Sequence, residues 1–266
     1  MSDYTFNPDA AARRLQDAGR DGQLLIELPL DERPATVADG YLVQAAVLDM
    51  RDLPDQSGEP VVGWKIAGAS PRCLRGALPT VPLIGAIVPS RIIASGATLP
   101  VRPEAPLTLE AEVAVSFALD VCPADEPFDA ATMIDGVFAA IEVVRSRFVD
   151  RKAVGQPSFA ADNVGFHALV RGDALDVSRT AAFSGHVDMR FNDQVISHAL
   201  AGDDRTQPFD ALAFLWQEFA RRGTAIPRGA VITTGTLTLP VDVAEPGLVE
   251  ARVGNVRVAL RLTAGA

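Results

Sequence analysis

The sequence predicts an α+β protein in which a small helical N-terminal part packs on a larger, mixed and mostly β core. Two observations indicate this class. Helical periodicity with capping residues dominates residues 8–50. From about residue 80 onward, short β-rich runs are broken by Gly, Pro and Asp. We therefore expect a helical subdomain at residues 1–78 and a core at residues 79–266.

Two helices are expected near the N-terminus. Asn7 is a good capping residue and precedes a helix expected at residues 10–18, which Gly19 closes. A second helix is expected at residues 36–50, because its apolar residues fall near one stripe. A turn at residues 55–60 and a strand at residues 61–68 complete this part of the chain.

The core is expected to contain many strands and two helices. Residues 109–117 alternate as a strand does. A helix is expected at residues 130–138 and leads into a strand at residues 139–144. An amphipathic helix is expected at residues 208–222, closed by Gly223. Further strands are expected at residues 165–171, 182–191, 231–234, 248–253 and 256–262.

Composition and charge exclude several classes of function. The net charge is 24 − 34 = −10, which argues against a nucleic-acid partner, since phosphate binding needs a basic surface. No apolar run reaches the roughly 18 residues of a membrane helix, and no secretory signal is indicated at the N-terminus. Cys73 and Cys122 lack metal-type spacing and are expected to be reduced thiols, so we expect a cytoplasmic protein.

Three glutamates lie in apolar stretches, where a carboxylate is costly: Glu110, Glu112 and Glu142. Glu110 and Glu112 are two residues apart on a strand, so they project side by side and repel each other unless a cation lies between them. A third carboxylate would complete an all-oxygen site of the kind that Mg²⁺ or Mn²⁺ prefers. The alternative is a half-exposed edge strand with solvated glutamates.

Six segments, in order, carry a resemblance to a known family. They are Ala-Asp-Gly-Tyr-Leu-Val-Gln at 38–44, Val-Val-Gly-Trp-Lys-Ile-Ala-Gly at 61–68, Glu-Ala-Glu-Val-Ala at 110–114, Ile-Glu-Val-Val-Arg-Ser-Arg-Phe-Val-Asp at 141–150, Asp-Asn at 162–163 and Thr-Gly-Thr-Leu-Thr at 234–238. This series resembles the 2-keto-4-pentenoate hydratase group of the fumarylacetoacetate hydrolase superfamily, which also contains 4-oxalocrotonate decarboxylases. The resemblance covers about residues 36–262.

The resemblance implies a fumarylacetoacetate-hydrolase-like core and a metal-dependent lyase. Such an enzyme binds Mg²⁺ or Mn²⁺ through three carboxylates, which match Glu110, Glu112 and Glu142. It adds water to a 2-hydroxy-2,4-dienoate during the degradation of aromatic compounds. It also implies a homo-oligomer, or a complex with a homologous enzyme of the same pathway. The rest of the pocket is expected to be small and apolar, with residues such as Ile66, Val144 and Leu237.

The resemblance also implies roles for residues outside the carboxylate set. Lys65 is expected to act as a general acid or as a cation that faces the enolate, although a strand lysine can equally reach solvent. Arg147 is expected either to bind a substrate carboxylate or to pair with Asp150. Asp162 is expected to be catalytic, or only to begin a turn. Substrate contacts are expected from Thr234, Gly235 and Thr236.

The sequence departs from the family pattern at three places. No Asp or Glu lies between Lys65 and Glu104, where the family commonly places an acid. The serine that follows Asp-Asn in the family is missing, since Val164 and Gly165 follow Asn163, and Arg151 stands where a tryptophan is often found. These departures make a different arrangement of proton donors and acceptors one possible outcome.

Other functions therefore stay open. The runner-up activity is 4-oxalocrotonate-type decarboxylation. An acylpyruvate C–C hydrolase is disfavoured, because that chemistry uses a histidine in the N-terminal part and no histidine precedes His167. A non-catalytic partner subunit would fit the missing acid–base residues but not an intact set of three carboxylates.

Overall fold

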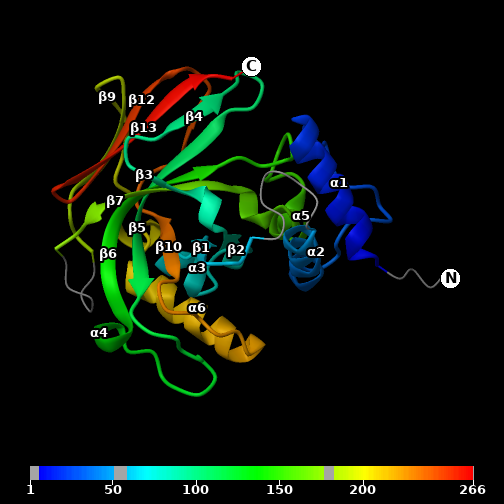
Figure 1. Cartoon of the computed structure of the whole chain (residues 1–266), viewed down its shortest axis with the longest axis horizontal. Coiled ribbons are helices and arrows are strands. Elements are labelled where there is room, and N and C mark those ends of the chain that lie inside the picture. The colour runs from blue at the N-terminus through cyan, green and yellow to red at the C-terminus, as the bar shows by residue number, and fades with distance from the viewer. Residues whose placement is uncertain (1–5, 51–58, 177–182, 266) are drawn as a thin grey trace.

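The computed structural model describes residues 6–50, 59–176 and 183–265. Two β-sheets make up the core, and helices cover its sides (Figure 1). This arrangement confirms the expected α+β class with a mostly β core. Within these residues, no helix has both the length and the apolar character needed to cross a membrane.

The larger sheet is mixed and has eight strands. The β1–β10 and β3–β7 pairs are parallel, whereas the other neighbours are antiparallel. In order across the sheet, the strands are β2 (Leu83–Ile87), β1 (Gly63–Ala67), β10 (Val231–Thr236), β5 (Leu107–Phe117), β6 (Ile134–Val144), β7 (Phe166–Ala174) and β3 (Ile92–Ala94), with β11 (Val241–Val243) also paired to β5.

The smaller sheet has five strands and shares an apolar core with the larger one. Val113 and Ile141 of the larger sheet belong to the same buried cluster as Val249 and Leu260 of the smaller sheet. Helix α6 (Pro208–Arg222) adds Phe219 to this cluster. The strands of the smaller sheet, in order, are β4 (Thr98–Val101), β13 (Val256–Ala264), β12 (Gly247–Val253), β8 (Val187–Phe191) and β9 (Gln194–His198).

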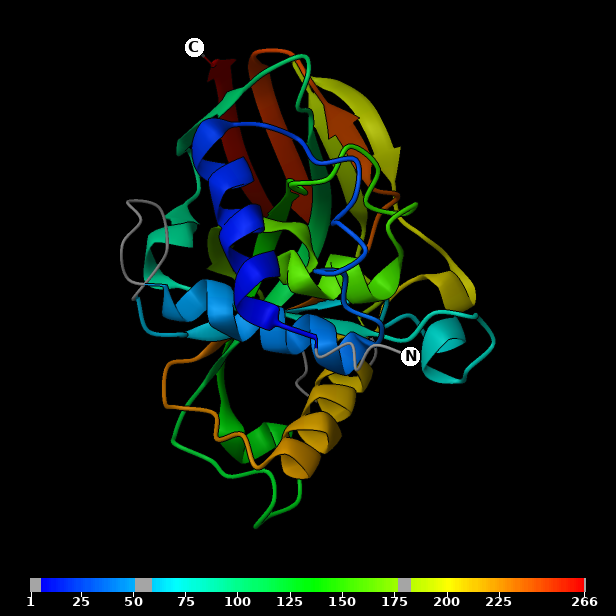
Figure 2. The same ribbon diagram turned by 90° about the vertical axis from the view of Figure 1, so that its right-hand side faces the viewer.

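A separate helical layer lies beside the larger sheet. Figure 2 shows α1 (Pro8–Asp21), α2 (Val37–Asp49) and α5 (Gly155–Ala161) together in front of the strands. Leu15, Val43 and Phe148 belong to the apolar cluster that holds this layer together. Helix α5 comes from the second half of the chain, so the helical layer is not built from the N-terminal segment alone.

Local capping explains the ends of the long helices. The Asn7 side chain accepts a hydrogen bond from the Asp9 amide at the start of α1, and Thr36 forms a capping box with Asp39 at the start of α2. Helix α1 passes the expected end at Gly19 and stops at Gly22, which adopts φ 65°. Helix α6 has the bounds expected from the sequence.

The prediction of a helix at residues 130–138 is wrong over most of its length. Only one helical turn forms there, α4 (Ala130–Met133), and β6 begins at Ile134. The reason is tertiary, because Ile134 is already paired with Phe117 of β5 and both side chains are buried. The sequence analysis did not find β2, β3, β4, β9 and β11.

The division of the chain at residue 78 stays a prediction. Strand β1 precedes that boundary and lies between β2 and β10 in the larger sheet. Part of the turn expected at residues 55–60 lies outside the described residues. The remaining short elements are α3 (Pro71–Leu74), η1 (Pro89–Arg91), η2 (Asn163–Gly165) and η3 (Gly202–Asp204).

Candidate metal centre and active site

Three carboxylates converge where the central strands β5 and β6 pair. Glu110 lies directly opposite Glu142 in the strand register, and Glu112 follows on the same face of β5. Glu112 and Glu142 are fully buried, and Glu110 is half-buried. One carboxylate oxygen from each residue lies within 4.8 Å of the others. Because β5 lies between β10 and β6, it is not the solvated edge strand of the alternative interpretation.

The cluster has negative charge that its hydrogen bonds do not balance. Burial and the charge of Glu142 raise the pKa of Glu110 to about 7. Burial and the charges of Glu142 and Glu110 raise the pKa of Glu112 well above its ordinary value. Glu112 Oε1 and Glu142 Oε2 have no hydrogen-bond partner among the described residues. Buried oxygens without donors are costly, and three hard oxygen ligands fit Mg²⁺ or Mn²⁺.

Strand β10 fixes the orientation of Glu112. Its Oε2 atom accepts a short hydrogen bond from the Thr233 hydroxyl and a 2.9 Å hydrogen bond from the Gly235 amide. Gly235 adopts φ 101°, and a Cβ at this position would lie 3.2 Å from the carbonyl oxygen of Ile66. With Oε2 held in this way, Oε1 of Glu112 is left as the oxygen available to a cation.

Lys65 lies beside the carboxylates and does not reach solvent. It is 2% exposed on β1, and its Nζ atom lies 2.7 Å from Glu142 Oε1. Its strand partner on β10 is Thr233, the residue that also orients Glu112. Strand β1 thus places one ammonium group against the carboxylates of β5 and β6, where it partly offsets the negative charge.

A cavity of about 280 Å³ opens beside this cluster. Lys65, Glu110 and Thr236 line it from the larger sheet. Asp204 lines it from η3 and forms an ion pair of 3.1 Å with Arg72. The other lining residues are Ala67, Gly68, Ser70, Val144, Arg151, Phe159, Thr206 and Pro240.

Of the three apolar residues expected to line the pocket, one does so. Val144 lines the cavity, but Ile66 and Leu237 are fully buried in the main apolar core. Ile66 follows Lys65 on β1, so strand alternation turns its side chain to the opposite face. The cavity wall combines apolar groups with cationic, anionic and hydroxyl groups, which suits a small polar ligand better than a hydrocarbon chain alone.

The residues expected to contact substrate at the end of β10 have different surroundings. Thr236 lines the cavity, whereas Thr234 is buried and donates a 2.8 Å hydrogen bond to the Val113 carbonyl. Gly235 contributes its amide to Glu112. The sequence analysis missed Thr233, whose only local signal was its position directly before the recognised Thr-Gly-Thr segment.

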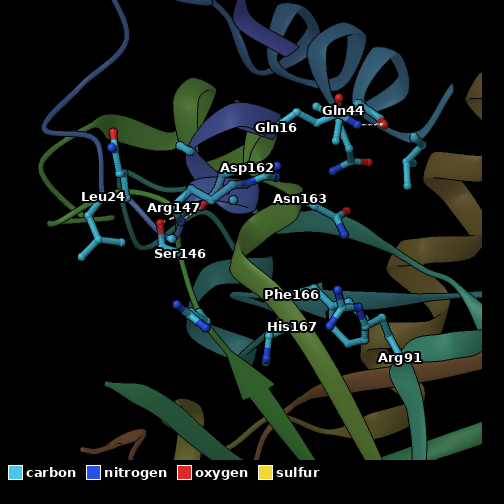
Figure 3. A pocket seen from close by; sticks show the side chains of 17 residues that line it. Gln16, Leu24, Gln44, Arg91, Ser146, Arg147, Asp162, Asn163, Phe166 and His167 are labelled. Carbon is cyan, nitrogen blue, oxygen red and sulfur yellow. Dashed lines mark hydrogen bonds and ion pairs between the residues drawn. The ribbon is translucent and has the colours of Figure 1, made fainter. Parts of the chain in front are cut away.

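Arg147 and Asp162 meet in a different pocket, of about 340 Å³ (Figure 3). Arg147 Nε donates to Asp162 Oδ1 at 2.5 Å, and Asp162 also accepts a 2.6 Å hydrogen bond from the Ser146 hydroxyl. Gln16 and Gln44 line the same pocket from α1 and α2. Arg147 therefore pairs with Asp162, and not with Asp150 as one of the two expectations had it. Neither Arg147 nor Asp162 lines the cavity beside Lys65.

Asn163 connects this second pocket to the larger sheet. Its side chain accepts from the Ala86 amide at 2.7 Å and donates to the Ala86 carbonyl at 2.9 Å. Asn163 and Val164 adopt φ 51° and 55°, which is costly for a β-branched residue. Val164 is fully buried, so packing compensates for this backbone conformation.

In residues 6–50, 59–176 and 183–265, Glu110, Glu112 and Glu142 are the one group of His, Cys, Asp or Glu with suitable spacing. Cys73 and Cys122 are free thiols. Burial lowers the pKa of His167 to about 3, with the nearby Arg91 and Arg145 adding to the effect.

Comparison with protein families places this site in a known context. Residues 73–259 match the model described as fumarylacetoacetate (FAA) hydrolase C-terminal. The chain belongs to the fumarylacetoacetate hydrolase family. This confirms the family inferred from the six sequence segments.

Relatives and solved structures are similar over nearly the whole chain. A 2-keto-4-pentenoate hydratase of Burkholderia vietnamiensis (strain G4 / LMG 22486) is 29% identical over 97% of this chain and 98% of the relative. A 4-oxalocrotonate decarboxylase of Pseudomonas putida is 27% identical over 90% and 89%. The 4-oxalocrotonate decarboxylase from Pseudomonas putida G7, solved with magnesium and adipate, matches with a TM-score of 0.79 and 23% identity over 96% of this chain and 97% of that structure.

Proposed function

We propose that this chain is a divalent-metal-dependent hydro-lyase that adds water to a 2-hydroxy-2,4-dienoate in the degradation of aromatic compounds. The observation that carries the proposal is the contact of buried Lys65 with Glu142 inside a cluster of three carboxylates. The hydratase relative, at 29% identity, supports the reaction class. We further propose a cytoplasmic homo-oligomer, alone or with a homologous enzyme of the same pathway.

Glu110, Glu112 and Glu142 would hold the ion, and the buried Glu oxygens without partners fit this role. A bound Mg²⁺ or Mn²⁺ supplies Lewis-acid polarisation of a 2-oxo acid. Solved relatives contain magnesium with adipate or calcium with acetate, so hard cations and carboxylates occur together in those proteins.

The chain's own groups would then position the substrate and move protons. Lys65 is close enough to the carboxylates to stabilise negative charge that develops on the substrate oxygen, and to donate a proton. Thr236 presents its side chain to the cavity, while Thr233 and Gly235 keep Glu112 in place. Catalytic roles for Arg147 and Asp162 remain predictions, and their contacts fit a role in joining the end of β6 to η2.

Decarboxylation of 4-oxalocrotonate is the second candidate. It is favoured by the Pseudomonas putida relative, which is 27% identical over 90% of this chain. The two reactions need the same polarised 2-oxo acid, so the carboxylate cluster and Lys65 serve both.

A direct assay separates these functions. The purified chain with Mg²⁺ would be given 2-hydroxypenta-2,4-dienoate and, separately, 4-oxalocrotonate. Loss of the diene absorbance without release of CO₂ is expected for the hydratase, and CO₂ release from 4-oxalocrotonate for the decarboxylase. EDTA should abolish either activity. Absence of turnover on both compounds, at saturating Mg²⁺, would indicate the non-catalytic partner subunit instead.

A further inference from the structure

Arg151 is a second cation in the cavity of the carboxylate cluster. It lines the same space as Lys65 and Glu110. Lys65 is engaged with Glu142, whereas Arg151 forms no ion pair with any carboxylate of the described residues. A guanidinium group that is partly removed from solvent, without a carboxylate partner, is a ready binding group for an anion.

A chain of hydrogen bonds fixes the position of this guanidinium group. Arg151 Nη1 donates to Thr108 Oγ1 at 2.9 Å, and the Thr108 hydroxyl donates to Asp242 Oδ1 at 2.5 Å. Thr108 is 6% exposed and is paired with Asp242 between β5 and β11. The contact occupies one nitrogen of the guanidinium group and leaves the rest of the fork available to a ligand.

Strand β5 places Thr108, the hydrogen-bond partner of Arg151, close to the candidate metal centre. Thr108 and Glu110 are two residues apart on the same face of β5, so their Cα atoms are about 7 Å apart. Arg151 and Glu110 line the same cavity. A short carbon chain that is bound through one end at the carboxylate cluster can therefore reach Arg151 with its other end.

We propose that Arg151 forms a binding subsite for the second carboxylate of a dicarboxylic 2-oxo acid. A planar guanidinium group and a carboxylate can form two parallel hydrogen bonds. A ligand with a methyl group in place of this carboxylate cannot form them. This inference rests on the proposed function, because it assumes that the 2-oxo end of the ligand binds at the carboxylate cluster. Among 2-hydroxy-2,4-dienoates and 2-oxo acids, it makes Arg151, oriented by Thr108, the residue that favours those with a carboxylate at the far end over those without one, such as 2-hydroxypenta-2,4-dienoate.

The test compares two ligands that differ only at the far end. Binding of 2-oxoadipate and 2-oxohexanoate to the Mg²⁺-loaded protein is measured by calorimetry, for wild type and for Arg151→Met. We expect wild type to bind 2-oxoadipate at least about tenfold more tightly. Arg151→Met should lose this preference while its affinity for 2-oxohexanoate is unchanged, and Arg151→Lys should retain part of it. Lys152→Met, which removes an exposed charge from the next residue, should bind both ligands as wild type does.

Each other result overturns the proposal. If wild type binds the two ligands equally, this measurement alone rejects the subsite, without any variant. An equal loss for both ligands in Arg151→Met would mean that Arg151 acts on the shared 2-oxo end. A preference that survives in Arg151→Met and in Arg151→Gln would place the second carboxylate elsewhere. If neither ligand binds, or if binding does not depend on Mg²⁺, the proposed function fails as well.

Discussion

At the scale of single residues, the carboxylate cluster depends on Glu112 most directly. Both neighbouring strands constrain it, and it is fully buried. Replacing Glu112 by Gln removes a charge but keeps the shape. We expect metal binding to weaken and turnover to fall by about 100-fold or more, since even the loss of a group that hydrogen-bonds to a metal ligand costs about 10–100-fold. Metal titration measures the change in metal affinity, and steady-state kinetics measure the change in turnover.

The matched control is Glu104→Gln. Glu104 is exposed and lies 3.5 Å from Arg102, away from the cluster. The Glu104→Gln variant should keep the activity and the metal affinity of wild type. Unchanged metal affinity and unchanged turnover in Glu112→Gln would show that the cluster is not the metal site.

Lys65 provides a second residue-level prediction. We expect Lys65→Met to lower kcat far more than it lowers metal affinity, because the ammonium group acts on the substrate and the carboxylates hold the ion. Without metal, the variant should also be less stable, since removing one partner of a buried ion pair costs roughly 3–5 kcal/mol. Kinetics at saturating Mg²⁺ and denaturant unfolding with EDTA test the two parts separately. A variant with full kcat would remove Lys65 from the mechanism.

At the scale of secondary-structure elements, the close contact between α2 and α5 depends on Gly40. A Cβ added there would lie 2.3 Å from the Pro157 carbonyl oxygen. We expect Gly40→Ala to destabilise the protein by about 1–3 kcal/mol, although alanine is the better helix former. Thermal or denaturant unfolding measures this change.

Gly19 of α1 is the matched control for Gly40. The nearest atom to a Cβ at Gly19 is Arg147 Cδ at 3.5 Å, an ordinary contact. Gly19→Ala should therefore stabilise the protein by roughly 0.5–1 kcal/mol, through helix propensity alone. Equal and favourable effects of the two substitutions would contradict the packing of α2 on α5.

At the scale of the whole molecule, stability should depend on pH through the carboxylate cluster. Glu110 has a pKa of about 7 in the folded protein, against an ordinary value of 4.5. Between these values the folded protein holds a proton that the unfolded chain has released. The free energy of unfolding of the metal-free protein should therefore fall as pH rises from about 4.5 to 7. Glu110→Gln should weaken this dependence.

Added Mg²⁺ should reverse this trend, because the ion takes the place of the proton. We expect the increase in Tm on adding Mg²⁺ to be larger at pH 8 than at pH 5. Thermal unfolding at both values, with EDTA or Mg²⁺, makes the comparison. An increase that is equal at both values, or larger at pH 5, would contradict proton displacement by the ion.

Local features of this protein could be predicted from its amino-acid sequence. Alternation in residues 109–117 identified β5, a capping residue identified α1, and an apolar stripe identified α2, because these signals lie within a few residues of each other. The cost of burying charge singled out Glu110, Glu112 and Glu142. The six segments identified the family, which the match over residues 73–259 confirms.

Contacts between residues that are distant in the sequence became known from the folded chain. The strand register places Glu142 opposite Glu110 and brings Thr233 to Glu112, and no local pattern encodes a register between strands far apart in sequence. Pairing with β5 turned residues 134–138 from the expected helix into strand. For the same reason the sequence could not show that Arg151 lines the cavity of Lys65 while Arg147 lines the other pocket. The two arginines are four residues apart, and only the folded chain determines which pocket each one lines.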